Sequence, residues 1–325
     1  HMALVKLNSE NARLRGRLAL SRTMVFESAA MQRVGEIVER VAGRDVTVLI
    51  VGETGTGKEL IARAIVDASP RAKARFVRFN CAALSRDLVE AELFGHSRGA
   101  FTGAVRERKG LFREAHHGTL FLDEVNSLDP SAQAALLRVL QEREVRPVGE
   151  DRSVPVDVRL IAATGRPLDE EPGFRKDLYY RLNVVTIRLP PLRERQEDIA
   201  PLVRHFVERY AAAFGLGRVE VPDALMARLV AAPWPGNVRE LEHTIESMLA
   251  LSVDGLISDE LIDGVVPREA RDERAPIVAT DVHDADVGLK VRMNAYERGI
   301  LAATLAACGG NRSEAARRLG VDRVT

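Results

Sequence analysis

Short apolar runs alternate with helix-like stretches between residues 46 and 190. The runs lie at 46–51, 76–79, 119–122, 158–163 and 184–187, and many of their residues are β-branched. Stretches with helical periodicity separate them at 58–68, 85–94 and 131–142. Continuous apolar runs of this length, alternating with helices, predict a parallel sheet covered on both faces. We therefore expect an α/β domain over residues 24–190.

The pattern after residue 190 contains helices and no strands. Helical periodicity covers 197–214, 222–232 and 237–251, with glycine and proline breakers between these stretches. This pattern predicts a separate all-helical subdomain over residues 191–266.

Residues 267–292 mix charged residues, proline and alanine without periodicity, which indicates a linker. Helical periodicity returns at 293–308 and 313–319, and we assign 293–325 to a small C-terminal segment. The pattern stops at Thr325 without a helix-stop signal, so we expect the chain to end inside an element.

The first 23 residues have heptad-like spacing. Apolar residues and one asparagine recur at every third or fourth position: Leu4, Leu7, Asn11, Leu14 and Leu18. A surface helix and a short coiled coil between two subunits explain this spacing equally well. His1-Met2 resembles a cloning scar and no signal peptide follows, so we expect a piece of a longer protein.

Composition excludes several classes of protein. The 325 residues include 47 Lys and Arg against 47 Asp and Glu, so no basic coat for nucleic acid covers the whole chain. No apolar run approaches the roughly 18 residues of a membrane span, and we expect no membrane partner. Two distant cysteines, Cys81 and Cys308, argue against a disulfide scaffold and favour a cytoplasmic protein.

A phosphate-binding motif follows the first predicted strand and opens a helix. It reads Gly52-Glu53-Thr54-Gly55-Thr56-Gly57-Lys58 and has the spacing of a phosphate loop. Its glycines let backbone amides converge on phosphate oxygens, and Lys58 is placed to reach the β- and γ-phosphates of a nucleotide. Glu59 stands where a Ser or Thr usually binds magnesium, which by itself weakens the case for metal-assisted hydrolysis. A glycine-rich turn formed by chance is the weaker explanation.

Two carboxylates end the strand predicted at 119–122. In a parallel sheet the carboxyl ends of the strands form the ligand-binding edge. Asp123 is suited to hold Mg²⁺, directly or through water, and Glu124 to orient and polarise the attacking water. An acidic helix cap is the alternative, and the phosphate loop upstream makes it the weaker one.

Small residues surround one aromatic residue at Gly99-Ala100-Phe101-Thr102-Gly103-Ala104. Such residues favour a loop and cannot build a core. An aromatic side chain on a loop tip indicates contact with a partner, although Phe101 could equally fill a gap in its own domain.

These motifs resemble those of one protein family. The sequence GAFTGA at 99–104 follows ELFGH at 92–96, and further motifs lie at 80–83, 118–124, 174–182, 189–195 and 234–241. Together they resemble the bacterial enhancer-binding proteins, the AAA+ ATPases that activate sigma-54 RNA polymerase. The resemblance covers about residues 24–252 and the C-terminal helices. It is strongest to response regulators of the nitrogen-regulator type, with the receiver domain absent. It implies an AAA+ P-loop domain, a helical lid and a Fis-like helix-turn-helix.

The resemblance assigns roles to several residues. A glutamate normally follows the phosphate-loop lysine in this family, so Glu59 no longer argues against Mg²⁺-assisted hydrolysis. ATP is expected at the interfaces of a hexameric or heptameric ring, where Arg175 and Arg181 match arginine fingers. Arg239 matches the lid arginine that senses nucleotide, and the turn at 234–236 positions it.

Two further residues match family positions near the γ-phosphate. Asn80 matches the residue that restrains the catalytic glutamate, although an asparagine there is more often a turn former. Thr164 can supply a hydroxyl near the γ-phosphate. Gly165 departs from the Asn or His that most members carry, and Phe26 replaces a common glycine.

The resemblance also predicts the partners. Phe101 and Thr102 match loop residues that touch sigma-54 in its complex with RNA polymerase, and ATP hydrolysis would move this loop to remodel the closed promoter complex. Enhancer DNA is expected at the C-terminal segment, through Arg312, Ser313, Arg317, Arg318 and Arg323. The recognition helix would begin near Asp322 and is cut at Thr325, so we expect weak DNA binding by this chain. A small helical hairpin without DNA binding also fits this segment.

Two alternatives compete with the sigma-54 activator. One is a general AAA+ remodelling ATPase or helicase loader, against which the loop with Phe101 argues. The other is a DNA-binding scaffold without hydrolysis, against which Lys58, Asp123, Glu124 and Arg175 argue.

Overall fold

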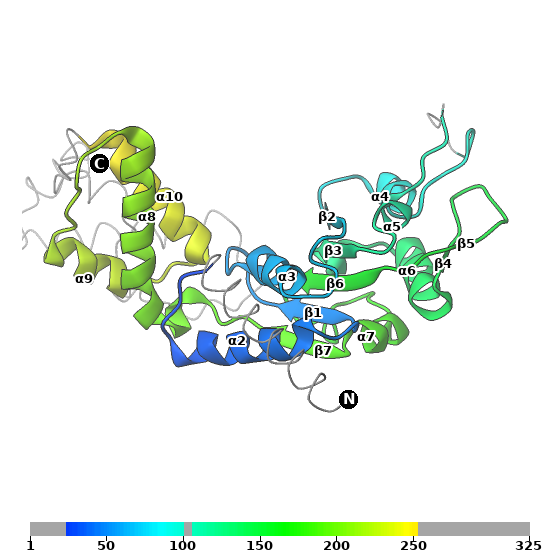
Figure 1. Ribbon diagram of the computed structural model, residues 1–325, viewed down its shortest axis with the longest axis horizontal. Coiled ribbons are helices and arrows are strands. Elements are labelled where there is room, and N and C mark those ends of the chain that lie inside the picture. The colour runs from blue at the N-terminus through cyan, green and yellow to red at the C-terminus, as the bar shows by residue number, and fades with distance from the viewer. Residues whose placement is uncertain (1–23, 101–105, 253–325) are drawn as a thin grey trace, which may run out of the picture. The chain divides into compact units, whose positions relative to one another are not determined.

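The structure of the protein is a computed structural model that describes residues 24–100 and 106–252 (Figure 1). Its main sheet has five parallel strands in the order β2-β3-β6-β1-β7. The strands are β1 (Val48–Val51), β2 (Phe76–Asn80), β3 (Thr119–Asp123), β6 (Arg159–Thr164) and β7 (Val185–Arg188). Each lies within two residues of a predicted run, so the expected parallel sheet is confirmed.

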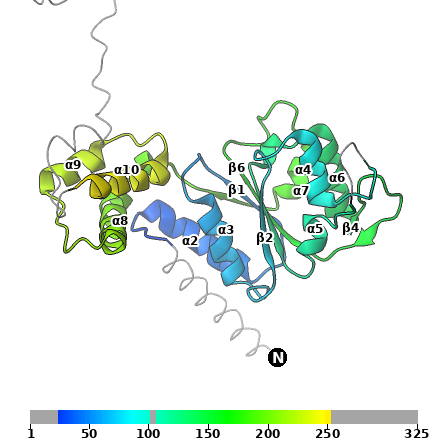
Figure 2. The same cartoon turned by 90° about the horizontal axis from the view of Figure 1, so that it is seen from above.

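Helices cover both faces of this sheet, as Figure 2 shows. Helices α2 (Ala29–Ala42) and α3 (Lys58–Asp67) pack on one face, against side chains such as Ile50 and Ile161. The other face holds α4 (Arg86–Phe94), α5 (Leu111–Glu114), α6 (Pro130–Glu142) and α7 (Lys176–Leu182). Successive strand residues point to opposite faces, so the continuous apolar runs supply both cores.

Capping residues explain where two of these helices begin. The Ser28 side chain accepts a hydrogen bond from the Met31 amide at the start of α2. The Asp129 side chain accepts one from the Ala132 amide, and Pro130 occupies the first turn of α6. These side chains satisfy amides that the helix itself leaves unpaired.

Three helices and a hairpin of the α/β part were not predicted. They are α2, α5, α7 and a small antiparallel hairpin formed by β4 (Glu144–Val145) and β5 (Val154–Pro155).

The helical subdomain, called the lid below, has its own core. It contains α8 (Ile199–Phe214), α9 (Asp223–Ala231) and α10 (Asn237–Leu251), preceded by the 3₁₀ turns Leu192–Glu194 and Gln196–Asp198. Trp234 is completely buried among these helices, and its indole N–H donates to the Leu229 carbonyl at 2.7 Å. The expected all-helical fold of this subdomain is confirmed.

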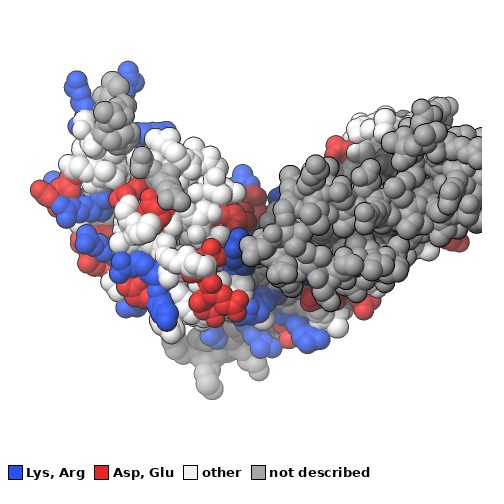
Figure 3. Space-filling view, turned by 180° about the vertical axis from the view of Figure 1, so that it is seen from behind, with Lys and Arg blue, Asp and Glu red and all other residues white. Residues whose placement is uncertain are grey.

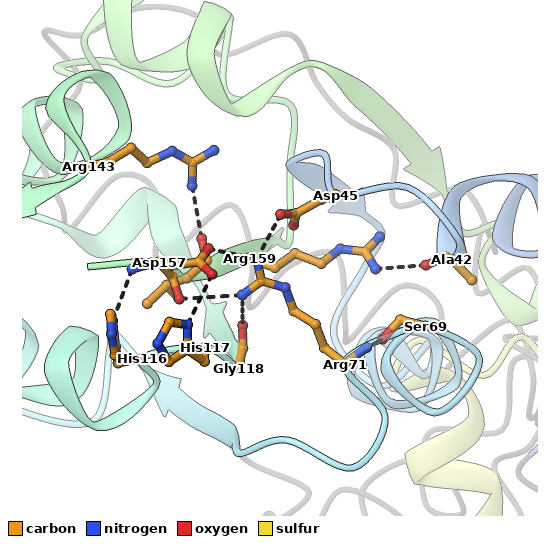
Figure 4. A network of polar contacts seen from close by, with 11 residues as sticks. Ala42, Asp45, Ser69, Arg71, His116, His117, Gly118, Arg143, Asp157 and Arg159 are labelled. Carbon is orange, nitrogen blue, oxygen red and sulfur yellow. Dashed lines mark hydrogen bonds and ion pairs between the residues drawn. The ribbon is translucent and has the colours of Figure 1, made fainter. Parts of the chain in front are cut away.

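A polar network joins the loops at the amino-terminal edge of the sheet (Figure 4). The Arg71 guanidinium contacts carboxylates of Asp45 and Asp157, both at 2.7 Å, and the Gly118 carbonyl at 3.0 Å. Arg159 is buried and donates to two carbonyls at the end of α2. These contacts connect four loops that precede strands, at the edge opposite the phosphate loop.

Several predictions concern residues outside the described part. The heptad-like helix at 1–23, the linker at 267–292 and the segment at 293–325 all lie there. The boundaries of the five predicted segments, 1–23, 24–190, 191–266, 267–292 and 293–325, remain predictions. Among the described residues, no helix is long and apolar enough to cross a membrane. Basic and acidic side chains are interspersed over the described surface in Figure 3.

Candidate nucleotide-binding site

The phosphate loop connects β1 to α3 with a backbone that needs glycine. Gly55 and Gly57 have φ angles of 82° and 101°, in the left-handed region. No side chain caps the start of α3, so its first amides point at the space in front of the helix. Uncapped amides at a helix N-terminus, together with the helix dipole, suit a phosphate group.

Lys58 lies between this loop and the acidic end of β3. Its side chain is 6% exposed, and its ammonium donates to the Gly52 carbonyl at 2.9 Å. The same nitrogen is 3.5 Å from Glu124 Oε1. The structure therefore brings together the lysine and the glutamate that the sequence predicted as parts of one site.

Asp123 and Glu124 form the acidic strand end. Burial raises the pKa of Asp123; Lys58 opposes this rise, and the carboxylates of Glu124 and Glu59 add to it. A partly buried carboxylate among acidic neighbours is stabilised by a divalent cation.

The donors present fit Mg²⁺, which commonly uses one or two protein carboxylates together with phosphate oxygens and water. Within 24–100 and 106–252, no cluster of three or more His, Cys, Asp or Glu could hold a metal by itself. The nucleotide would therefore have to complete the coordination.

Asn80 and Thr164 end the strands on either side of β3. Asn80 is paired with Asp123 in the sheet, and its side-chain oxygen accepts from the Ala82 amide at 2.8 Å. This is the turn-forming geometry named above as the commoner role of such an asparagine. Thr164 is buried, with its hydroxyl 3.1 Å from the side-chain oxygen of Asn126. Sequence reasoning missed Asn126.

Gly165 leaves open space beside the glutamate. A Cβ atom at this position would lie 3.5 Å from Glu124 Oε2. A larger side chain here would therefore contact the Glu124 carboxylate directly, and the glycine removes that contact.

The lid packs directly on the phosphate loop. A Cβ atom on Gly55 would lie only 2.2 Å from the Gly236 carbonyl oxygen and 3.2 Å from Arg239 Cβ. Arg195, which is 1% exposed, donates to the Thr56 carbonyl at 3.0 Å. The predicted lid arginine is thus beside the predicted phosphate site.

Two further lid residues contact the loop through Glu53. Arg193 donates to both carboxylate oxygens, at 2.8 and 2.6 Å, and the Asn237 amide donates to one of them at 3.1 Å. These hydrogen bonds, that of Arg193 first, lower the pKa of Glu53 to about 2. Sequence reasoning gave Arg193 and Asn237 no role, because nothing along the chain places them next to residue 53.

Three known families match successive parts of the chain. Residues 24–188 match the sigma-54 interaction domain, residues 193–276 the AAA+ ATPase lid domain, and residues 293–325 the Fis family of bacterial regulatory proteins. The chain belongs to the bacterial enhancer-binding proteins. This confirms the resemblance and the predicted fold class: an AAA+ α/β domain, a helical lid and a C-terminal Fis-type helix-turn-helix.

Relatives and solved structures agree with this membership. The chain is 48% identical over 308 residues to the transcriptional regulatory protein ZraR of Klebsiella oxytoca, covering 93% of this chain and 67% of that protein. It is 49% identical over 301 residues to the Nif-specific regulatory protein of Klebsiella pneumoniae, covering 92% of this chain and 56% of that one. The chain thus spans just over half to two thirds of these relatives. The crystal structure of NtrX from Brucella abortus in complex with ADP has a TM-score of 0.71 at 35% identity, covering 98% of this chain and 70% of that chain.

The two candidate arginine fingers of this enhancer-binding protein lie at the start of α7 and within it, and neither contacts the chain's own phosphate loop among the described residues. Arg175 precedes the helix, and its exposed guanidinium makes two hydrogen bonds to Asp177, at 3.0 and 2.8 Å. Arg181 lines a small cavity of about 200 Å³ with Asp45 and Thr47, at the opposite end of β1 from the phosphate loop. Neither arginine joins Lys58 and Glu124 within one chain.

The base of the candidate sigma-54 loop is held by backbone hydrogen bonds. The His96 and Arg108 backbones pair in both directions, each at 3.0 Å. The Ser97 amide donates to the Val148 carbonyl at 3.1 Å, and the Val148 amide donates to the Gly95 carbonyl at 2.8 Å. Of the predicted partner-binding residues, Gly99 and Ala100 are described, while residues 101–104 lie outside the described part, as do the predicted DNA-binding residues.

Proposed function

We propose that this chain hydrolyses ATP to ADP and phosphate in a ring of identical subunits, and that the loop at 99–104 uses the cycle to remodel the sigma-54 RNA polymerase closed complex. The observation that carries the proposal is the meeting of Lys58, Asp123 and Glu124 at the carboxyl ends of β1 and β3. Membership of the sigma-54 activator family supplies the partner. It also favours this function over a general AAA+ remodelling ATPase.

The chain's own groups account for binding and hydrolysis. Backbone amides of residues 52–58 and the Lys58 ammonium would hold the β- and γ-phosphates. Mg²⁺, held by Asp123 with Glu124 nearby, would neutralise phosphate charge. Glu124 would orient a water whose oxygen attacks the γ-phosphorus while the bond to the β–γ bridging oxygen breaks. The water's proton passes to Glu124 and then to the products.

Residues around this centre would register the γ-phosphate. Thr164 ends β6 beside it, and Asn80 ends β2 on the other side of Asp123. Arg239 follows the lid turn that contacts Gly55. We propose that these groups report the nucleotide state to the lid and the sheet.

A neighbouring subunit would complete the site. The Arg175 guanidinium is exposed and is held by the carboxylate of Asp177, two residues further along the chain, which leaves it accessible to another copy. Guanidinium groups stabilise the charge that spreads over a transferred phosphoryl group. We therefore assign Arg175 and Arg181 to the site of the next subunit in a hexameric or heptameric ring, and enhancer DNA to residues 293–325.

Phosphate release and sigma-54 binding test the proposal together. Wild-type protein at concentrations that allow self-assembly should release phosphate from ATP, and absence of release would overturn the proposal. In the presence of an ADP–metal-fluoride mimic of the transition state, it should bind sigma-54.

Phe101→Ala separates the loop from the chemistry. This variant should keep hydrolysis and lose sigma-54 binding, because the aromatic tip contacts the partner. Phe214→Ala is the control, since it removes an exposed phenylalanine from the end of α8 in the lid. Loss of hydrolysis in Phe101→Ala alone would give Phe101 a structural role and remove it from the partner surface.

A further inference from the structure

Glu53 occupies an unusual place for a carboxylate. It is the second residue of the phosphate loop, beside the position where a triphosphate carries its charge. A negative side chain there repels the ligand unless another group neutralises it. The start of α3 and Lys58 are placed to bind the phosphates, whereas the Glu53 carboxylate cannot bind them and has a different role.

The hydrogen bonds of the Glu53 carboxylate run to the lid. Arg193 meets its carboxylate with two parallel N–H···O bonds, and Asn237 adds a third. Arg193 belongs to the first 3₁₀ turn after the α/β domain, and Asn237 starts α10. The Glu53 carboxylate therefore binds two lid segments to the phosphate loop: the turn that enters the lid and the start of α10.

Asn237 joins the lid to the phosphate loop in this arrangement. It is completely buried, has a φ angle of 56°, and its side-chain oxygen accepts the Leu192 amide at 2.7 Å. Its side-chain amide also lies 3.1 Å from the Thr54 carbonyl. Because an asparagine tolerates the left-handed backbone and offers both donor and acceptor, it can join the two lid segments and the loop at once.

The position of Arg239 depends on the same turn. Arg239 is two residues beyond Asn237 on α10, and its Cβ lies close to Gly55 in the loop. A shift of the turn would carry this arginine away from the phosphates. Holding the turn in place before nucleotide arrives lowers the ordering cost of binding.

We propose that Glu53 is a positioning residue: its paired contacts with Arg193 and Asn237 latch the lid onto the phosphate loop and so place Arg239 for nucleotide. The three residues together are called the lid latch below. The inference rests on the proposed nucleotide-binding function and adds a residue role to it.

Electrostatic repulsion alone and the lid latch predict opposite changes in ADP affinity for Glu53→Gln. Glu53→Gln removes a negative charge beside the phosphates, so simple electrostatics predicts tighter ADP binding. The lid latch predicts weaker binding, by about threefold to tenfold, because the bidentate ion pair with Arg193 is lost. A fluorescent ADP analogue measures this affinity, and unchanged or tighter binding would overturn the inference.

A double-mutant cycle asks whether the effect passes through Arg239. If Glu53 acts by placing Arg239, Glu53→Gln should weaken ADP binding much less in an Arg239→Ala background than in wild type. Equal losses in both backgrounds would mean that Glu53 does not act through Arg239. Arg209→Gln is the matched control, because Arg209 forms an exposed ion pair with Glu242 at 2.9 Å within the lid, and it should bind ADP as wild type does.

Hydrogen exchange tests the lid latch without nucleotide. Peptides that contain Leu192 or residues 234–240 should exchange severalfold faster in Glu53→Gln than in wild type or Arg209→Gln, because the lid turn opens more often. Equal exchange in all three proteins would overturn the lid latch. Failure of the proposed function appears instead as a wild-type protein that releases no phosphate, so the two failures are distinguishable.

Discussion

Gly55→Ala is expected to force the lid turn off the phosphate loop. The added Cβ would approach the Gly236 carbonyl oxygen to 2.2 Å, a separation that only movement of one backbone can relieve. Gly57→Ala is the matched substitution in the same loop. Both glycines have positive φ angles, of 82° and 101°, but the nearest atom to a Cβ on Gly57 is Met24 Cε at 3.3 Å.

The two variants differ by the contact with the lid. A left-handed backbone costs an ordinary residue about 1–2 kcal/mol, and both variants carry this cost. Only Gly55→Ala also displaces the turn, which removes the hydrogen bonds from Asn237 to Thr54 and Glu53. At about 1 kcal/mol each, these raise its expected total to about 3–4 kcal/mol.

Urea unfolding of the free protein measures the difference. We expect Gly55→Ala to lower the free energy of unfolding by about 2 kcal/mol more than Gly57→Ala does. If the two variants lose the same free energy of unfolding, the lid turn does not contact the phosphate loop in solution.

Three further expectations follow from other contacts. Glu124→Gln should bind ATP and hydrolyse it about 10²–10⁴-fold more slowly, since an amide is no base; phosphate release at saturating ATP measures this, and undiminished turnover would exclude Glu124 from the mechanism. Trp234→Ala should cost about 3–5 kcal/mol in urea unfolding, because it empties the centre of the lid core and removes the bond to the Leu229 carbonyl; a loss below about 1 kcal/mol would contradict the packing. Arg71, and after it His117, hold the pKa of Asp157 below its ordinary value. The Asp157 carboxylate therefore stabilises the fold above the ordinary pKa of about 4, and this contribution fades as pH falls through the lowered pKa. Asp157→Asn should thus be less stable than wild type near neutral pH, by under about 1 kcal/mol because the group is half exposed, and the gap should close in acid; a gap that widens would reverse the assignment.

Much of the fold was predictable because its elements carry strong local signals. The strands are continuous apolar runs, and α3, α6, α8 and α10 have clear periodicity bounded by glycine, proline or capping residues. Helix α2 was missed although Met31, Val34, Val38 and Val41 repeat at helical spacing and are all buried, so that signal was available. Helix α7 has seven residues and β4 and β5 two each, too short for a period to show.

The apolar pattern of the sequence did not predict the order of the strands in the sheet. Strand β1 lies between β6 and β7, and β3 separates β2 from β6. Apolar runs buried on both faces look alike, so their composition does not say which neighbour each will take.

The sequence by itself determined the chemistry that depends on neighbours along the chain. The spacing from Gly52 to Lys58 sets a loop that binds phosphate, and an apolar run ending in Asp123 and Glu124 sets an acidic strand end, because backbone geometry over a few residues follows from the residues themselves. Only the tertiary structure decided what meets across the site. The partners of Glu53 lie 140 and 184 residues further on, and their contact depends on how the lid packs on the loop, which no local pattern encodes.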